Sequence, residues 1–347
     1  MAPDRPTAHP GAGGDRRPRL TPAMADARRA VRATLTDIEA GGLVLVALSG
    51  GPDSLALAAA TAFEAPRAGL RAGAVIVDHQ LQERSAEVAE RAAEQARGLG
   101  LAPVLVERVR VAGAGTGSGA GGPEAAARDA RYAALDAAAR RLTASTVLLG
   151  HTLDDQAETV LLGLARGSGA ASLSGMAAVN GLYRRPFLGL RRASTVQACR
   201  DQGLDAWSDP HNSDPAYARV RVRERVLPLL ETELDPGVVE ALARTAELLR
   251  DDADALERMV DEVAEELVEL DDGGCSVPVA WIVANPRAIA SRLVRLVARV
   301  EFGLSLSREQ TLEVLRLATD WHGQGAVHLS GVRVRRADGR IVFTAAE

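Results

Sequence analysis

The sequence predicts an α/β fold: a doubly wound parallel sheet followed by a smaller, mainly helical C-terminal domain. Short apolar runs alternate with helical periods over the first two thirds of the chain, which is typical of parallel strands buried on both faces. A Gly-rich turn directly follows the first apolar run, where doubly wound folds bind phosphate. Further along, long amphipathic helices replace this alternation. We therefore expect a basic tail at 1–22, a first domain at 23–232 and a second at 233–347.

Each element of the first domain has its own signal. The tail is rich in Pro, Gly and Arg, and should be disordered. Apolar runs of four to six residues predict four buried strands, at 43–48, 73–77, 104–109 and 146–149. Apolar residues at helical spacing predict helices at 25–40, 55–63, 85–99 and 123–142, and a further one from Leu153. The Gly-rich stretch at 112–122 predicts a flexible loop.

The second domain begins with a long helix that has an acidic outer face. We expect helices at 236–270, 285–302 and 307–319, then strands at 326–329, 332–335 and 340–344. Between residues 235 and 272, fourteen acidic residues outnumber three arginines, a local charge of −11 against −5 for the whole chain. The remainder is mildly basic, at +6, so RNA stays a candidate partner despite the acidic total.

The sequence contains no lysine, so all 41 of its Lys-plus-Arg residues are arginines. Walker A loops and protein kinases need a lysine on the phosphates, and Schiff-base enzymes need a lysine amine. These three classes are excluded. The abundance of Ala, Gly and Arg points to the codon usage of a GC-rich genome as the cause.

The two cysteines, Cys199 and Cys275, lack the spacing of a disulfide framework or a cysteine-based metal site. The N-terminus has no apolar segment typical of a signal peptide, and no run of about 18 apolar residues could span a membrane. We expect a protein of the reducing cytoplasm with no membrane partner. The sequence leaves the oligomeric state open, a homodimer included.

The strongest chemical signal is a hexapeptide that joins the first predicted strand to the helix after it. Its residues are Ser49, Gly50, Gly51, Pro52, Asp53 and Ser54. Two glycines let backbone N–H groups approach an anion, the helix N-terminus adds positive potential, and the serine hydroxyls can donate hydrogen bonds. Asp53 can hold Mg²⁺ against a di- or triphosphate. A shorter motif would indicate an ordinary turn with a capped helix, whereas the full hexapeptide in this position predicts a phosphate site.

A second set of polar residues follows the fourth predicted strand, in the segment GHTLDDQAET. If the helix begins near Leu153, Asp154 and Glu158 are spaced i, i+4 and share a face toward the site. With His151 and Asp155 they could bind Mg²⁺, orient an amine and accept its proton. The alternative is that the two aspartates complement the helix dipole and that the histidine is a neutral turn residue. For Asp155 the two interpretations balance, and for His151 and Glu158 we favour function.

Further candidates lie elsewhere in the first domain. Asp78 and His79 end the second predicted strand, where an adenosine would extend along a doubly wound sheet. Arg219 and Arg223 belong to a run in which every second residue is arginine, and guanidinium groups match phosphate oxygens. This run would share one face on a strand and spread over two on a helix.

Together these motifs resemble one family, the tRNA(Ile)-lysidine synthetases among the PP-loop (N-type) ATP pyrophosphatases. SGGPDS is similar to the PP-loop, and GHTLDDQAET is the most diagnostic of the other matches. The resemblance is dense from about Leu43 to Leu230 and weaker beyond. Its other positions include Asp78-His79, Glu124 to Arg128, Arg131-Tyr132, Arg166 to Gly169, Arg185-Pro186, Asp209-Pro210, Arg219, Arg223 and Leu227 to Leu229.

The resemblance implies ATP-dependent ligation of free L-lysine to C2 of the wobble cytidine in a tRNA(Ile) with the anticodon CAU. ATP would adenylate the cytidine with release of pyrophosphate, and lysine would then displace AMP; the domain at 233–347 would bind the tRNA. ATP and Mg²⁺ are the implied cofactors, the hexapeptide with Asp78 and His79 holding the nucleotide, and Asp53 and Asp155 the metal. The implied catalytic residues are Asp53, Glu158, His151 and Asp155, with Glu158 or Asp53 as the base. The implied contacts to tRNA, lysine or pyrophosphate are Arg128, Arg131, Asp154, Arg219 and Arg223.

The sequence departs from the family pattern in places, and other functions stay open. Gln80 and Gln82 stand where the family usually has Gly and Arg, and Val220 stands where Asn is common. A related tRNA thiolase would use a similar loop but needs cysteines near the site. An amidotransferase-type synthetase would need a glutaminase domain or an amine-delivering partner. A non-catalytic nucleotide- or RNA-binding module would bind ATP or tRNA without releasing pyrophosphate.

Overall fold

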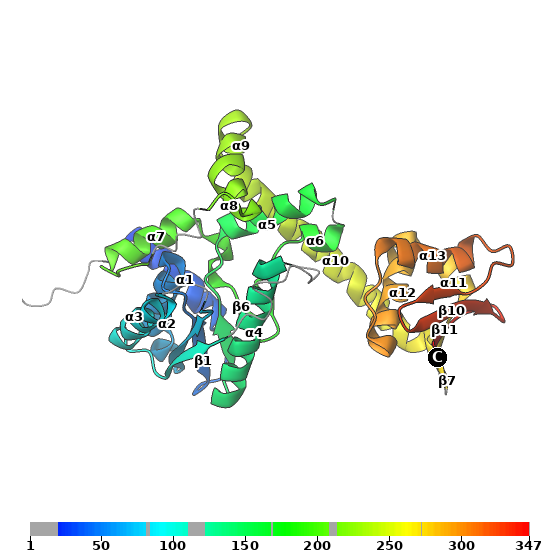
Figure 1. The fold of residues 1–347 in the computed structure, drawn as a ribbon, viewed down its shortest axis with the longest axis horizontal. Coiled ribbons are helices and arrows are strands. Elements are labelled where there is room, and N and C mark those ends of the chain that lie inside the picture. Colours follow the sequence, from blue (N-terminus) through cyan, green and yellow to red (C-terminus); the bar gives the residue numbers. More distant parts are fainter. Residues whose placement is uncertain are drawn as a thin grey trace, which may run out of the picture. The chain divides into compact units, whose positions relative to one another are not determined.

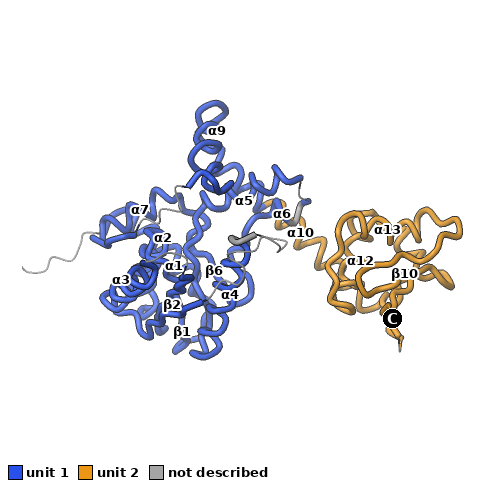
Figure 2. Tube along the Cα trace, in the orientation of Figure 1, with its two compact units in different colours: residues 1–247 blue, residues 248–347 orange. Residues whose placement is uncertain are grey.

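The computed structural model describes residues 20–80, 84–109, 122–167, 169–207, 214–271 and 273–346. The chain divides into two compact units, residues 1–247 and 248–347 (Figure 2). This division falls within helix α10 (Val238–Leu267), and the boundary expected at 232/233 stays a prediction. The expected tail at 1–22 and loop at 112–122 lie outside the described residues, apart from 20–22 and 122.

A six-stranded sheet forms the centre of the first unit, in the order β3-β2-β1-β4-β6-β5. Its strands are β1 (Leu43–Ala47), β2 (Arg71–Asp78), β3 (Val104–Arg108), β4 (Thr146–Leu148), β5 (Val179–Asn180) and β6 (Tyr183–Arg184). Neighbouring strands are parallel except β5 and β6. The predicted doubly wound parallel sheet is therefore confirmed. Its strand order reverses between β1 and β4, the point at which such folds bind ligands.

Helices cover both faces of this sheet (Figure 1). They are α1 (Pro22–Thr34), α2 (Pro52–Glu64), α3 (Ser85–Gly98), α4 (Gly122–Leu142), α5 (Leu153–Ala165), α6 (Ala170–Leu173), α7 (Arg192–Asp201), α8 (Ala218–Arg221), α9 (Leu227–Glu233) and the start of α10. Val44 and Val46 of β1 pack into the core shared with α1, α2, α3 and α7, whereas Leu43 and Leu45 pack into the core shared with α4. Burial of alternate residues in two cores explains why the strand sequence is apolar throughout.

Among the described residues, the second unit is built from the C-terminal part of α10, three further helices and an antiparallel sheet in the order β7-β8-β11-β10-β9. The helices are α11 (Val279–Ala284), α12 (Arg287–Phe302) and α13 (Arg308–Thr319), and the strands are β7 (Glu269–Asp271), β8 (Gly274–Pro278), β9 (Val327–Leu329), β10 (Val332–Ala337) and β11 (Arg340–Ala345). In β10, buried valines alternate with the exposed Arg333 and Arg335, so one face of this sheet meets the core. The helical C-terminal domain is confirmed, with a larger sheet than expected.

Some elements differ from the expectation. The helix predicted to reach residue 270 ends at Leu267, and β7 and β8 follow it as a hairpin. The short β5–β6 hairpin and α7 were also missed, because two-residue strands and a polar ten-residue helix leave little periodicity to detect. None of the helices in the described part of the chain is long and apolar enough to cross a membrane.

Candidate active site

The SGGPDS turn leaves β1 and enters α2, as the sequence predicts. Gly50 has a φ of +84°, in the left-handed region that favours glycine. Gly51 is the N-cap of α2, and Pro52 occupies the first turn, where a helix needs no N–H donor. The Ser54 hydroxyl donates to the Gly51 carbonyl over 2.9 Å and accepts from the Ser49 N–H over 3.2 Å. These bonds close the turn and leave the N-terminus of α2 as an anion site.

Gly150 brings the second motif against this loop. A Cβ at Gly150 would lie 3.2 Å from the Ser54 nitrogen and 3.3 Å from the carbonyl carbon and oxygen of Asp53, so a side chain there would force the two segments apart. Helix α5 begins three residues later, at Leu153, after its N-cap Thr152. Because β1 and β4 are neighbours, both motifs meet at the same edge of the sheet.

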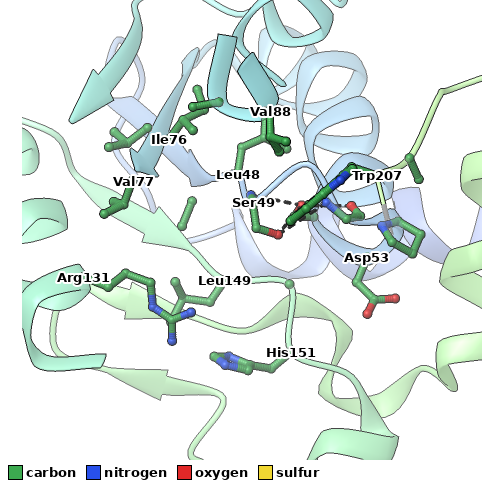
Figure 3. Close-up of a pocket in the computed structure, with 18 of the residues that line it drawn as sticks. Leu48, Ser49, Asp53, Ile76, Val77, Val88, Arg131, Leu149, His151 and Trp207 are labelled. Carbon is green, nitrogen blue, oxygen red and sulfur yellow. Dashed lines mark hydrogen bonds between the residues drawn. The ribbon is translucent and has the colours of Figure 1, made fainter. Parts of the chain in front are cut away.

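A cavity of about 840 Å³ lies at this edge, a volume typical of small-molecule sites (Figure 3). The predicted site residues in its wall are Ser49, Gly51, Pro52, Asp53, Ser54, Asp78, His79, Arg131, His151, Asp155 and Arg223. The predicted residues that do not line it are Gly50, Arg128, Asp154, Glu158 and Arg219. Residues from five separate segments therefore converge on one space, as the sequence analysis expected for most of them.

Glu158 holds three arginines together from inside the protein. Its side chain is 0% exposed. Oε1 accepts from Arg223 Nε over 2.7 Å and from Arg192 Nη1 over 3.2 Å. Oε2 accepts from Arg219 Nε over 2.7 Å and from Arg223 Nη2 over 3.0 Å. Glu158 is thus the centre of an arginine cluster behind the cavity wall.

The Asp155 carboxylate both caps helix α5 and binds an arginine of the site, so both interpretations of this position apply. Oδ2 accepts from the Thr152 N–H and hydroxyl, each over 2.8 Å, which completes a capping box at the start of α5. Oδ1 accepts from Arg192 Nη2 over 2.7 Å. Burial opposes ionisation, but the charges of Arg192 and Arg219 outweigh it and lower the pKa of Asp155 below its ordinary value. This carboxylate is ionised at the cavity wall.

Asp53 has a different electrostatic environment. Burial raises the pKa of Asp53, although a hydrogen bond from Thr195 and the nearby charge of Arg192 oppose the rise. The Thr195 hydroxyl donates to Oδ1, and Arg192 Nε lies 3.4 Å from Oδ2. One guanidinium therefore faces Asp53, Asp155 and Glu158 at once.

Two histidines and Arg131 form the opposite part of the wall. Burial, with the charges of Arg185 and Arg131, lowers the pKa of His151 to about 3 although Asp155 opposes the shift, so this imidazole is neutral at neutral pH. Burial and the charge of Arg131 lower the pKa of His79 too. Arg131 forms no ion pair with a carboxylate among the described residues, and its guanidinium lies 5.7 Å from the Tyr132 ring centroid. Figure 3 shows Arg131 and His151 lying near each other in the cavity.

The remaining predicted residues lie around the site. Asp154 accepts from the Arg192 N–H over 2.6 Å, so Asp155 rather than Asp154 shares the arginine partners of Glu158. Arg128 is exposed and donates to Tyr132 over 3.4 Å. The arginine run forms α8 and a π-helical turn (Val222–Val226), which directs Arg219 and Arg223 to the same carboxylate.

Comparison with known proteins agrees with this geometry. The PP-loop domain matches residues 24–230, and the TilS substrate binding domain matches residues 278–342. The tRNA(Ile)-lysidine synthase of Leifsonia xyli is 62% identical over 304 residues, covering 87% of this chain and 90% of that protein. The chain belongs to the tRNA(Ile)-lysidine synthase family.

Other relatives extend the match. The lysidine synthase of Thermobifida fusca is 55% identical, covering 93% of this chain and 98% of its own, and that of Streptomyces coelicolor is 56% identical, covering 87% and 85%. A solved U34-tRNA thiolase from Methanococcus maripaludis, described with its [4Fe-4S] cluster, has a TM-score of 0.55 at 18% identity, over 66% of this chain and 80% of its own. The thiolase likeness shows a shared fold.

The lysidine synthase site has the donors for Mg²⁺. Asp53 and Asp155 both approach the guanidinium of Arg192, so their carboxylates face one small space beside the phosphate loop. Mg²⁺ is commonly held by one or two carboxylates together with substrate phosphates and waters. The described residues contain no group of three or more His, Cys, Asp or Glu that could hold a metal.

Three residues of the lysidine synthase site were not expected from the sequence. Arg192 and Thr195 lie in the first turn of α7 and reach Asp53. Trp207 lines the cavity, and its backbone N–H donates to the Gly50 carbonyl over 3.0 Å. The adjacent pair Arg191-Arg192, shortly after Arg185-Pro186, was the available signal for the first of these.

The low pKa of His151 predicts a pH-dependent stability. The folded protein keeps this imidazole neutral down to about pH 3, whereas the unfolded chain binds a proton near 6.5, so stability is lost as the pH falls between these values. At pH 5 the loss should be about 2 kcal/mol. When the pH is lowered from 7.5 to 5, the free energy of unfolding measured in urea should fall by about 2 kcal/mol less for His151→Asn than for the parent protein. The contribution of His79 is common to both proteins, and equal pH dependences would contradict the prediction.

Proposed function

We propose that this protein ligates free L-lysine to C2 of the wobble cytidine in a tRNA(Ile) with the anticodon CAU. The C2 carbonyl oxygen would attack the α-phosphate of ATP, with pyrophosphate leaving. The side-chain amine of lysine would then attack C2, losing a proton as AMP leaves. The observation that carries the proposal is the cavity in which a lysine-free phosphate loop meets Asp53, Asp155 and an arginine cluster, in a chain of the lysidine synthase family.

The proposed role of each cavity residue depends on its environment. The N–H groups of the phosphate loop would bind the triphosphate, and Asp53 with Asp155 would hold Mg²⁺, which supplies charge stabilisation to the leaving pyrophosphate. Asp53 faces the cavity, where its carboxylate can orient the lysine ammonium. Glu158 lies behind the wall with both oxygens bound to arginines. We therefore propose that Asp53 orients the lysine ammonium and that Glu158 positions the arginines.

The opposite wall suits a base and a phosphate. His151 is neutral and lines the cavity, so its imidazole can contact a polar edge of cytosine. Arg131 can bind the α-phosphate, since no carboxylate in the described part of the chain neutralises it. The wobble base must leave its stack to enter the cavity, as is usual when proteins read single-stranded RNA.

The test is to incubate the protein with ATP, isotope-labelled lysine and a tRNA(Ile) transcript bearing CAU, and to analyse the nucleosides by mass spectrometry. We expect one labelled lysine per AMP and per pyrophosphate released. A methionine tRNA with the same anticodon is the matched control and should incorporate none. Release of AMP with no lysine in the nucleoside would refute the proposal.

Sulfur transfer, the activity of the thiolase with a similar fold, is the second candidate. Cys199 lines the cavity, but burial raises the pKa of its thiol to about 11, so it is not a thiolate at neutral pH. The sequence has two cysteines, and Cys275 belongs to the core of the second unit. This cysteine content does not fit a cysteine-ligated cluster or a persulfide relay, so the cysteine chemistry favours lysine ligation.

A further inference from the structure

Arg192 is the one cation of the site that touches the phosphate loop's own carboxylate. Among the described arginines it alone pairs with Asp53, over 3.4 Å. It also reaches Asp155 over 2.7 Å and Glu158 over 3.2 Å. Its side chain is 21% exposed and lines the cavity. Arg192 thus bridges the two motifs between which a nucleotide would lie.

The other arginines of the cluster bind mainly to Glu158. Arg219 and Arg223 each place Nε on Glu158 at 2.7 Å and approach the carboxylate of Asp155 no closer than 3.6 Å. If the Arg192 side chain moves away, Glu158 keeps two close partners. Asp53 and Asp155 would instead keep Thr195 and Thr152 as their closest donors. Arg192 is therefore the member of the cluster that can leave while Glu158 remains neutralised.

Hydrogen bonds hold the backbone of Arg192 in place, and its side chain extends from there to the cavity. Its N–H donates to Asp154 over 2.6 Å, and its carbonyl accepts from the Thr195 hydroxyl over 2.8 Å. The flexible stem of the side chain lies beyond these anchors and ends at the cavity. A change of rotamer can therefore carry the guanidinium from the carboxylates to a ligand in the cavity.

We propose that Arg192 exchanges between two partners, the carboxylates Asp53 and Asp155 in the free enzyme and the β- and γ-phosphates of bound ATP. This inference rests on the proposed function. Carboxylates that hold Mg²⁺ have less negative charge to offer a guanidinium, whereas the β- and γ-phosphates offer two and three non-bridging oxygens for its fork. The chain contains no lysine, so the cation that binds these phosphates from the protein would be an arginine. It would then stay with pyrophosphate as that group leaves.

The exchange predicts effects of opposite sign on two ligands. Arg192→Gln should weaken the binding of pyrophosphate in the presence of Mg²⁺ by about 10- to 100-fold, the value of a charge-assisted contact. The same change should tighten the binding of Mn²⁺ alone, measured by electron paramagnetic resonance, because the carboxylates are freed. AMP, which lacks the β- and γ-phosphates, should bind within about twofold of the parent value.

Arg191→Gln is the matched control, because the loss of any positive charge near the site weakens the binding of anions and strengthens the binding of cations. Arg191 is the neighbouring residue, but it pairs with Glu231 and Glu240 and does not line the cavity. Its variant should change neither affinity by more than about threefold. If Arg192→Gln does not fold, Arg192→Lys carries the test, since it keeps the charge without a fork and should still bind Mn²⁺ more tightly than the parent.

The outcomes separate the two proposals. Three outcomes would overturn the exchange while the parent protein still ligates lysine. They are an unchanged pyrophosphate affinity in Arg192→Gln, a weaker binding of both Mn²⁺ and pyrophosphate in that variant, and equal changes of affinity in the Arg191→Gln control. A parent protein that binds neither ATP nor pyrophosphate would overturn the proposed function and the exchange together.

Discussion

Replacing Glu158 with glutamine is expected to lower the free energy of unfolding by about 3 kcal/mol and to abolish AMP formation. The side chain is 0% exposed, and its two oxygens accept from Arg192, Arg219 and Arg223. Glutamine keeps the size but removes the charge, and its amide nitrogen can only donate. Three partly buried guanidinium groups would then lack their central counter-charge, and breaking a buried pair from one side is among the costliest single changes.

Urea unfolding followed by circular dichroism measures the first part, and a pyrophosphate-release assay the second. Glu224→Gln is the control: Glu224 is exposed and directly follows Arg223 in the chain, so the same chemical change should cost less than about 0.5 kcal/mol. A Glu158→Gln protein as stable as the control would show that the arginines do not depend on this carboxylate.

Sequence reasoning succeeded where one local signal decided the structure. The apolar run at Leu43 to Leu48 and the turn after it predicted a buried strand and a helix start, and both are present. The capping of α5 likewise depends on Thr152 and Asp155, three residues apart in sequence. Local rules of this kind hold because the contacts that enforce them lie within one turn.

The arginine cluster could not be predicted in the same way. Arg192 and Asp53 are 139 residues apart, and nothing near Arg192 in the sequence shows that its helix starts beside the phosphate loop. The expected pairing of Asp154 with Glu158 failed for a related reason: the spacing was right, but the partners that decide which aspartate faces the cluster come from α7 and α8. Tertiary contacts supply what spacing leaves open.

Gln80 shows a departure whose cost the structure makes visible. It stands where the family usually has glycine, and its φ is +54°, in the region that side chains disfavour. Its N–H donates to Asp78 over 3.0 Å, so the turn that carries Asp78 and His79 into the cavity is kept without glycine.

Asp53→Asn is expected to reduce the rate of AMP formation by at least about a thousandfold while leaving the protein as stable as the parent or slightly more so. The rate should fall because this carboxylate faces both the Mg²⁺ site and the lysine amine in the proposed function. Stability should not fall, because the raised pKa of Asp53 means that folding disfavours its charged form. Asparagine also retains an oxygen that can accept from Thr195.

Single-turnover release of AMP and urea unfolding at pH 7.5 measure the two effects. Asp205→Asn, at an aspartate that is 80% exposed, removes one negative charge from the same unit and should change neither quantity appreciably. An Asp53→Asn protein that loses activity only in proportion to its loss of folded structure would contradict the assignment. Glu158 should behave differently, with activity and stability falling together. Its charge is buried and neutralises three arginines inside the protein, so its loss destabilises the fold. The charge of Asp53 lies at the cavity wall, where burial disfavours it, so its loss affects activity and not stability.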